Sequence, residues 1–300
     1  MSTTVTSTNR PATEVPRHDV PLGGRSGFTL IDGRQVHYLE WGASGAPAVL
    51  CLHGGGQTAY MYEELGRALR ERYHVLAPDL PDHGDSDPGD EFGRHGIAAT
   101  LPPLLEHFGL RTVAIVGASL GGIVAITHAA AHPDGVGAIV LIDVGHKLEE
   151  AGVLKIMEFM RAHESFGSLE EAATEIAKYL PHRKSVRPES LRRNLRERAD
   201  GRWVWKHGYS RRLRADESQT HNWRDVVEGL DTDAASLRCP VLVLRGAASD
   251  VLSHQGAEEI ATLIPNARLA TVQNAGHLAA GDNPESTVSL VASFLTDLTW

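Results

Sequence analysis

The chain of 300 residues carries 29 basic and 38 acidic side chains, a formal net charge of −9, and 42% of its residues are hydrophobic. This composition is typical of a globular protein with a sizeable core. No basic tract is dense enough to indicate a nucleic-acid surface. The cysteines, Cys51 and Cys239, are too few for a disulfide scaffold or a thiolate metal cluster, and we expect buried free thiols.

The N-terminal segment, residues 1–26, is rich in Ser, Thr, Pro and Gly, which predicts a flexible tail. It lacks the apolar stretch of a secretory signal. No window of the sequence approaches the run of about 18 apolar residues that spans a bilayer. We therefore expect a cytoplasmic protein with no membrane partner.

After the tail, GFTLI and RQVHYLEW flank Asp32-Gly33, a pattern that predicts a β-hairpin with a tight turn. Six short apolar runs follow, and such runs are typical of strands buried on both faces: AVLCL, YHVLAP, TVAIVG, AIVLIDV, PVLVLRG and ARLATV. Helical patterns follow most of them, over residues 60–72, 96–107, 120–132, 256–263 and 284–298. This alternation predicts an α/β fold with a mostly parallel eight-stranded sheet flanked by helices.

One region departs from the alternation. Residues 147–222 contain several helical segments and no convincing strand. We expect them to form a helical cap, inserted after strand six, over the sheet edge at which open α/β sheets bind ligands. The predicted organisation is a tail over 1–26, a core over 27–146 and 223–300, and this cap.

A serine stands where a predicted strand becomes a helix. In GASLGG, Gly117 and Gly121 flank Ser119, so a strained turn can form and lift the hydroxyl above the sheet. The helix N-terminus would direct free N–H groups at whatever Ser119 attacks. A simple helix-capping serine would not need both glycines, and we expect Ser119 to be a nucleophile.

A nucleophilic serine needs a base, usually a histidine that a carboxylate holds in place. In this type of fold the acid and then the base follow the serine, each just after a strand. His277 follows ARLATV, and Asp250 follows PVLVLRG. Asp143, which ends AIVLIDV, could also reach the histidine and is the alternative acid. Asp282 is expected to cap the last helix.

An oxyanion hole requires two backbone donors. The N–H of Leu120, directly after the serine, is the first expected donor. The second should come from HGGG, residues 53–56, where glycines allow the main chain to approach an oxyanion. Gly55 is our first choice, and Gly54 and Gly56 stay open.

These motifs are similar, in content and order, to those of the α/β-hydrolase fold superfamily, and within it to capped bacterial serine hydrolases. The resemblance covers residues from about 27 to 300 and also includes DLPDHGDSD, CPVLVLRGAASD and NAGH. It implies a triad of Ser119, Asp250 and His277 under a cap that shapes the pocket. One departure is Asp82, where the family usually has glycine, although aspartate tolerates left-handed backbone.

The arrangement predicts hydrolysis of a carboxylic ester, lactone or thioester through an acyl-enzyme, with no cofactor and no metal. A carbon–carbon bond hydrolase of a β-diketone-like substrate could use the same triad. A ligand-binding member of the fold without turnover is a further alternative.

The partner expected from these readings is a small-molecule substrate, apolar or aromatic, and not a nucleic acid. Trp203, Trp205, Met157 and Met160 in the cap are candidate substrate contacts, although they could equally form the core of the cap. The oligomeric state does not follow from the sequence.

Overall fold

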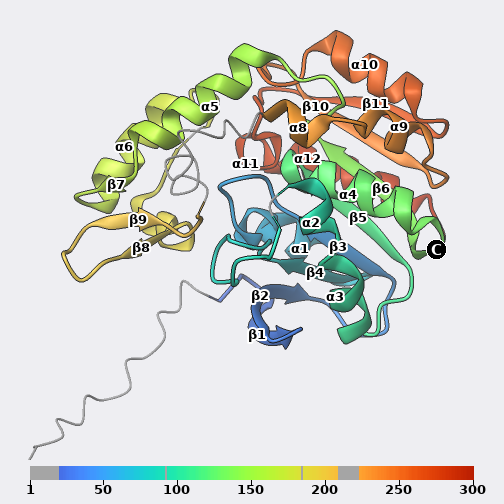
Figure 1. Ribbon diagram of the computed structural model, residues 1–300, viewed down its shortest axis with the longest axis horizontal. Helices are drawn as coiled ribbons and strands as arrows, with labels where there is room; N and C mark the ends of the chain where they lie inside the picture. Colours follow the sequence, from blue (N-terminus) through green and yellow to red (C-terminus); the bar gives the residue numbers. More distant parts are fainter. Residues whose placement is uncertain (1–19, 92, 184, 209–222) are drawn as a thin grey trace, which may run out of the picture.

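The computed structural model describes residues 20–91, 93–183, 185–208 and 223–300. Its centre is an eight-stranded sheet in the order β1-β2-β4-β3-β5-β6-β10-β11 (Figure 1). β2 is antiparallel to both of its neighbours, and the other pairs are parallel, which confirms the predicted fold class. The strands are β1 Arg25–Ile31, β2 Arg34–Trp41, β3 Ala48–Leu52, β4 His74–Pro78, β5 Val113–Ala118, β6 Val136–Ile142, β10 Val241–Gly246 and β11 Ala267–Val272.

The first hairpin has the predicted two-residue turn. Asp32 and Gly33 have φ values of 51° and 76°, the pair of positive values that matches the twist of the flanking strands. The predicted tail over 1–26 was too long at its end, because β1 already begins at Arg25. Residues 1–19 of that tail lie outside the described residues.

The central strands are buried on both faces, as their apolar runs predict. Every residue of β3, β4 and β5 is buried. Cys51 lies in β3 and is buried, whereas Cys239, just before β10, is half-buried, and both are free thiols.

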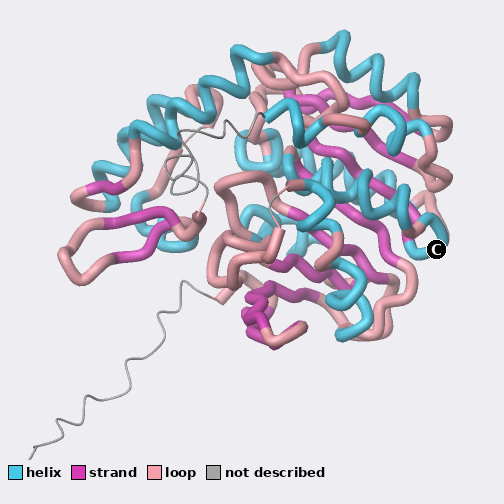
Figure 2. The backbone as a smooth tube through the Cα atoms, in the orientation of Figure 1, coloured by secondary structure: helices cyan, strands magenta, loops and turns pink. Residues whose placement is uncertain are grey.

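Helices cover both faces of the sheet (Figure 2). The segment 96–107, predicted as one helix, is two, because Pro102 and Pro103 lack the N–H groups that would continue the first one. One apolar core contains residues of α2 Arg94–Ala98, α3 Leu101–His107, α4 Leu120–Ala131, α9 Leu230–Ala235 and α10 His254–Leu263. The core on the other face contains residues of η2 Ala59–Tyr62, α1 Glu63–Leu69 and α12 Pro284–Thr296. Shorter helices are η3 Pro133–Gly135, α8 Trp223–Val227 and α11 Ala279–Asp282.

Between β6 and β10 the chain leaves the sheet and arches beside it (Figure 1). We call residues 147–208 the cap; the rest of the predicted insertion, 209–222, lies outside the described residues. The expectation of helices alone was wrong, because the cap also has a small sheet in the order β7-β9-β8. Its strands have two or three residues each, too few for an alternating pattern to show. The elements are α5 Glu150–Ala162, β7 Ser165–Phe166, α6 Leu169–Tyr179, η4 Pro188–Arg193, β8 Leu195–Glu197 and β9 Trp203–Trp205.

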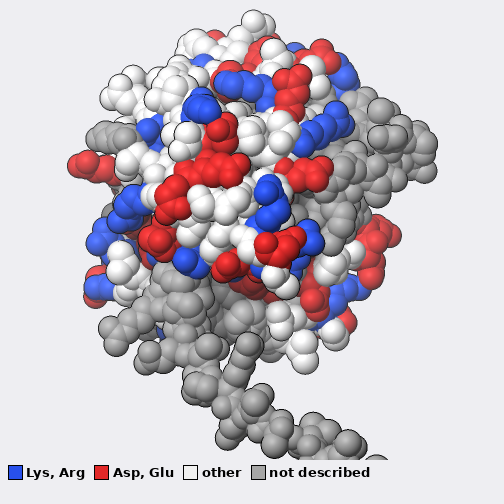
Figure 3. All heavy atoms as spheres, turned by 90° about the vertical axis from the view of Figure 1, so that its left-hand side faces the viewer, with Lys and Arg blue, Asp and Glu red and all other residues white. Residues whose placement is uncertain are grey.

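The side of the molecule that carries the cap has acidic and basic side chains interspersed (Figure 3). Within the described ranges, every helix is too short or too polar to cross a lipid bilayer.

Candidate active site

Ser119 occupies the turn between β5 and α4 in a strained conformation, with φ 47° and ψ −116°. The glycines around it are needed for close packing. A Cβ on Gly121 would lie 2.0 Å from the Leu52 carbonyl oxygen, and one on Gly117 would lie 2.4 Å from the Gly121 oxygen. The turn therefore presses against β3, as the motif predicts, and presents Ser119 at the carboxyl edge of the sheet.

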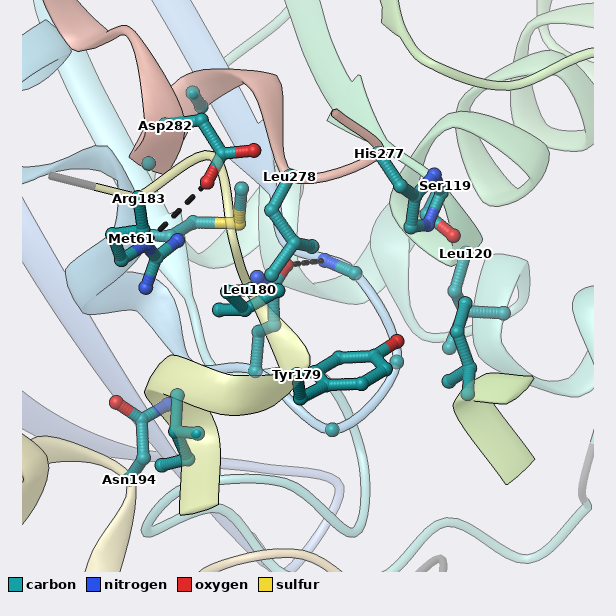
Figure 4. A pocket seen from close by; sticks show the side chains of 18 of the residues that line it. Met61, Ser119, Leu120, Tyr179, Leu180, Arg183, Asn194, His277, Leu278 and Asp282 are labelled. Carbon is teal, nitrogen blue, oxygen red and sulfur yellow. Dashed lines mark hydrogen bonds and ion pairs between the residues drawn. The ribbon is translucent and has the colours of Figure 1, made fainter. Parts of the chain in front are cut away.

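His277 lies in the loop after β11 and is held by a buried carboxylate. Its Nδ1 is 2.7 Å from Oδ2 of Asp143, whose side chain has no exposed surface. A carboxylate can only accept, so Nδ1 carries the proton and Nε2 keeps its lone pair. His277 and Ser119 line the same cavity, and Figure 4 shows their side chains together at its wall.

Asp143 sits directly after β6, also with a positive φ, 52°. β6 lies between β5 and β10 in the sheet, so its end is between the serine turn and the loop after β10. The other carboxylate oxygen, Oδ1, accepts the N–H of Gly246 at 2.9 Å. The alternative acid of the sequence analysis is thus the one that reaches the histidine.

Asp250, our first choice for the acid, does not hold the imidazole. Its side chain is 49% exposed, and Oδ2 accepts from the Lys155 ammonium of α5 at 2.8 Å. Burial raises the pKa of Asp250, but the Lys155 ammonium outweighs that effect and leaves this pKa below its ordinary value. The loop after β10 curls so that Asp250 meets the cap, a path that its sequence does not encode locally.

The HGGG loop is fixed by its histidine. The Nδ1–H of His53 donates to the Gly54 carbonyl at 2.8 Å, and Nε2 accepts the N–H of Leu80 at 2.9 Å. Burial, with the nearby His83, lowers the pKa of His53 to about 4, so the ring is neutral at pH 7. His53 therefore ties the glycine loop to the loop after β4.

The backbone donors of this loop are not equivalent. Gly54 donates its N–H to the Gln57 side chain at 3.2 Å, which occupies the donor that we kept as an alternative. A Cβ on Gly55 would be 4.0 Å from the Leu120 side chain, so Gly55 lies beside the first residue of α4. Leu120 begins that helix, where N–H groups have no acceptor within the helix.

A cavity of about 700 Å³ lies between the cap and the carboxyl edge of the sheet. Ser119, Leu120, Gly55 and His277 are among its lining residues. Much of the rest is apolar and comes from both parts of the chain: Met61, Ile97, Ile123, Val153, Ile156, Phe159, Ile176, Leu180, Val227 and Leu278. The site therefore combines a polar reacting edge with an apolar chamber.

Of the cap residues predicted to touch a substrate, Met157, Met160 and Trp205 line the cavity. Trp203 does not. It is buried in the separate apolar core of the cap, with the Arg192 guanidinium 4.7 Å from its ring centre. Its position opposite Phe166 in the small sheet turns it toward that core.

The polar end of the cavity holds an ion pair (Figure 4). Arg183 lies 3.5 Å from Asp282, whose carboxylate also accepts the Gly276 N–H at 3.0 Å. Asp282 was expected to cap the last helix. The N-terminal capping residue of α12 is instead Asn283, whose side chain accepts the N–H of Ser286 at 3.2 Å. Asp282 instead fixes the loop that carries His277.

Tyr179 also lines the cavity, although no motif of the sequence analysis points to it. Its ring stacks on Phe159 with centres 4.2 Å apart and an angle of 15°. Burial and the charge of Asp250 raise the pKa of Tyr179, so the phenol is protonated at neutral pH. A helical pattern alone does not distinguish such a residue from one in the core of the cap.

One group among the described residues brings three potential metal ligands together, His37, Asp79 and Asp85. Internal hydrogen bonds already engage it. His37 Nδ1 is 2.6 Å from Asp79, whose carboxylate also accepts the N–H groups of Ala59 and Asp85. Burial raises the pKa of Asp79, but His37, His53 and the Ala59 N–H together outweigh burial and leave this pKa below its ordinary value. We interpret the group as the support of the loop after β4.

The family model described as alpha/beta hydrolase fold matches residues 47–284. The chain is 31% identical to the esterase Rv0045c of Mycobacterium tuberculosis over an alignment of 279 residues, and this alignment covers 88% of each chain. It is 28% identical over 285 residues to the sn-1-specific diacylglycerol lipase ABHD11 of Mus musculus, covering 89% of this chain and 84% of that one.

Solved structures agree in fold. The crystal structure of E-2-(acetamidomethylene)succinate hydrolase has a TM-score of 0.78, with coverage of 91% and 99%, and its 22% identity supports a likeness of fold alone. A structure of the Mycobacterium tuberculosis esterase Rv0045c has a TM-score of 0.71 at 28% identity, with coverage of 91% and 92%. The family match and the 31% identical relative together show that this chain belongs to the α/β-hydrolase fold family.

Proposed function

We propose that the protein hydrolyses carboxylic esters through an acyl-enzyme on Ser119, with His277 as the base and Asp143 as the acid. The observation that carries the proposal is the 2.7 Å contact between His277 and the buried carboxylate of Asp143, at the cavity where the strained Ser119 turn opens. An imidazole with its proton fixed on Nδ1 is the form that can remove a proton from a serine.

In the first step, His277 Nε2 takes the hydroxyl proton as Ser119 Oγ attacks the ester carbonyl. The N–H groups of Leu120 and Gly55 donate to the oxyanion that develops. Asp143 stabilises the imidazolium, which then protonates the leaving alcohol as the carbon–oxygen bond breaks.

In the second step, a water molecule takes the place of the alcohol. His277 removes its proton as the water oxygen attacks the acyl carbonyl, and the same two N–H groups hold the second oxyanion. The imidazolium returns the proton to Ser119 Oγ, and the carboxylic acid leaves.

The cavity supports a small apolar or aromatic substrate. Its volume of about 700 Å³ lies within the range of ordinary ligand sites, and many of its lining side chains are apolar. Lactones and thioesters present the same electrophilic carbonyl and belong to the same proposal. The named activities of the relatives, an esterase and a diacylglycerol lipase, both concern carboxylic esters.

The test is the intact mass of the protein after a fluorophosphonate probe, together with hydrolysis of p-nitrophenyl esters of increasing acyl length. We expect one adduct and ester turnover in the unmodified protein, and neither in Ser119→Ala. A folded protein that forms no adduct would contradict the proposal and favour a ligand-binding role. An adduct without ester turnover, but with cleavage of a β-diketone, would replace it with carbon–carbon bond hydrolysis.

A further inference from the structure

The loop after β10 places a side chain, that of Ser249, in contact with the carboxylate of Asp143. The hydroxyl oxygen of Ser249 is 2.6 Å from Asp143 Oδ2, the same oxygen that lies 2.7 Å from His277 Nδ1. Ser249 directly precedes Asp250, the acid predicted from the sequence. It contacts Asp143, the carboxylate that holds His277 in the structure.

The direction of this hydrogen bond follows from the other contacts of Ser249. Its Oγ accepts the N–H groups of Val251 and Leu252 at 3.2 and 3.1 Å. Since a carboxylate only accepts, the single hydroxyl proton of Ser249 points to Asp143. Two backbone donors thus fix the oxygen, and the hydroxyl fixes the carboxylate.

We propose that Ser249 is a positioning residue for the triad, which holds the Asp143 carboxylate in the orientation that His277 requires. The inference rests on the proposed function, because it gives Ser249 a role only through Asp143 and His277. Without the hydroxyl, Oδ2 keeps the His277 Nδ1–H and Oδ1 keeps the Gly246 N–H, so the carboxylate stays beside the imidazole but its orientation is held less firmly.

The same loop touches the cap. Val251 accepts the N–H of Glu149, just before α5, at 2.8 Å, and a Cβ on Gly152 would lie 2.0 Å from the Asp250 carbonyl oxygen. Ser249 therefore connects the acid of the site to a loop on which the first cap helix rests.

The charges facing His277 set the sign of the expected pH effect. Asp143 makes direct contact, and Asp250, ion-paired with Lys155, acts at longer range. A carboxylate that loses a hydrogen-bond donor becomes more basic and stabilises the imidazolium more strongly. Loss of the Ser249 hydroxyl should therefore move the acid limb of kcat/KM to higher pH, whereas loss of the Asp250 charge should leave it in place or move it to lower pH.

The experiment measures kcat/KM against pH for an ester substrate in Ser249→Ala and Asp250→Asn. In Ser249→Ala we expect kcat/KM to fall about 10- to 100-fold, the range for a lost hydrogen bond to a charged group. We expect the acid limb to move up by roughly 0.5 pH units. In Asp250→Asn the limb should stay or move down, with kcat/KM within about threefold of the unmodified protein.

A second pair covers the case in which Ser249→Ala does not fold. Ser249→Thr keeps the hydroxyl, and Ser249→Val has nearly the same shape without it. Threonine should restore most of the activity and the original acid limb, and valine should restore neither. Equal kcat/KM and equal pH profiles for the two variants would overturn the inference. If instead the unmodified protein forms no adduct at Ser119, the proposed function itself fails.

Discussion

The two parts that enclose the cavity are held by different forces. In the core, Ser119 and Asp143 follow buried strands, and donors from the chain beside Asp143 fix its carboxylate. The cap is joined to the core by ion pairs, such as Arg193 with Glu63 at 2.6 Å and Lys206 with Asp85 at 2.7 Å. The Lys206–Asp85 pair, with its half-exposed carboxylate, weakens as salt rises, whereas the buried hydrogen bonds to Asp143 are hardly screened.

This difference matches the separate tasks of the core, which carries the reacting groups, and of the cap, which forms part of the cavity wall. The reaction needs groups placed to within a fraction of an ångström, and the strand ends of a packed sheet provide that. The choice of substrate needs walls of suitable size, and helices such as α5, with few buried residues, can provide them without precise placement. The following changes test this division.

The largest effect should come from Asp143→Asn. An amide in this place favours the wrong tautomer of His277, and we expect kcat to fall by a factor of about 10³ to 10⁴. Asp250→Asn is the matched control, because its partner is Lys155, and it should change kcat by less than about threefold. Equal losses in ester hydrolysis for the two variants would return Asp250 to the triad.

Acid should weaken the junction of cap and core, where His207 of the cap forms an isolated β-bridge with His83 of the loop after β4. Burial, with His83 and His53 nearby, lowers the pKa of His207 to about 3. Below pH 6.5, the ordinary pKa of a histidine, His207 binds a proton in the unfolded chain but not in the folded chain. The free energy of unfolding is therefore highest above pH 6.5 and decreases as the pH falls. This amounts to about 2 kcal/mol at pH 5.

The measurement is urea unfolding of His207→Gln at pH 7 and pH 5. The loss of stability between the two pH values should be smaller by about 2 kcal/mol than in the unmodified protein. His254→Gln, at a side chain that is 67% exposed, is the control and should leave the difference unchanged. An unaltered slope in His207→Gln would show that this histidine does not resist protonation.

The strain at the serine turn should be measurable as stability. Ser119→Gly and Ser119→Ala both remove the hydroxyl, but only glycine adopts φ 47° without a Cβ penalty. We expect Ser119→Gly to be more stable than Ser119→Ala by about 1 kcal/mol in urea unfolding. If alanine is as stable as glycine, the core does not store strain at this turn.

The smallest effect should come from the cap. Met157→Ala removes part of the cavity wall, so KM for long or aromatic acyl groups should rise about three- to fivefold, with acetyl esters unaffected. Leu154→Ala, on the same helix but 42% exposed and outside the cavity lining, is the control. Identical acyl-length profiles in both variants would mean that α5 does not select the substrate.

Much of the fold could be predicted because strands that are buried on both faces of a sheet consist of apolar runs. β3 begins and ends at the predicted residues, and β11 does as well. Asp82 has φ 63°, so the turn that usually contains glycine keeps its shape with aspartate. The short strands of the cap could not be predicted, because two or three residues are too few to show the alternation of apolar and polar side chains that marks a strand.

The site could be predicted as far as motif order reaches. Ser119 and His277 share a cavity, in line with their places after two strands. The acid could not be settled, because Asp143 and Asp250 both follow strands whose ends lie near the histidine. The turn of a few residues after Gly246, which presents Ser249 inward and Asp250 to Lys155, depends on packing against α5 rather than on local sequence.

The contact between Ser249 and Asp143 also has a consequence for protein engineering. These residues stand on either side of the whole inserted segment, so a chimera that takes its cap from a relative must keep both from one parent. Junctions placed after Asp143 and before Ser249 preserve this pair. Junctions between Ser249 and Leu252 would separate the hydroxyl from the two backbone groups that aim it.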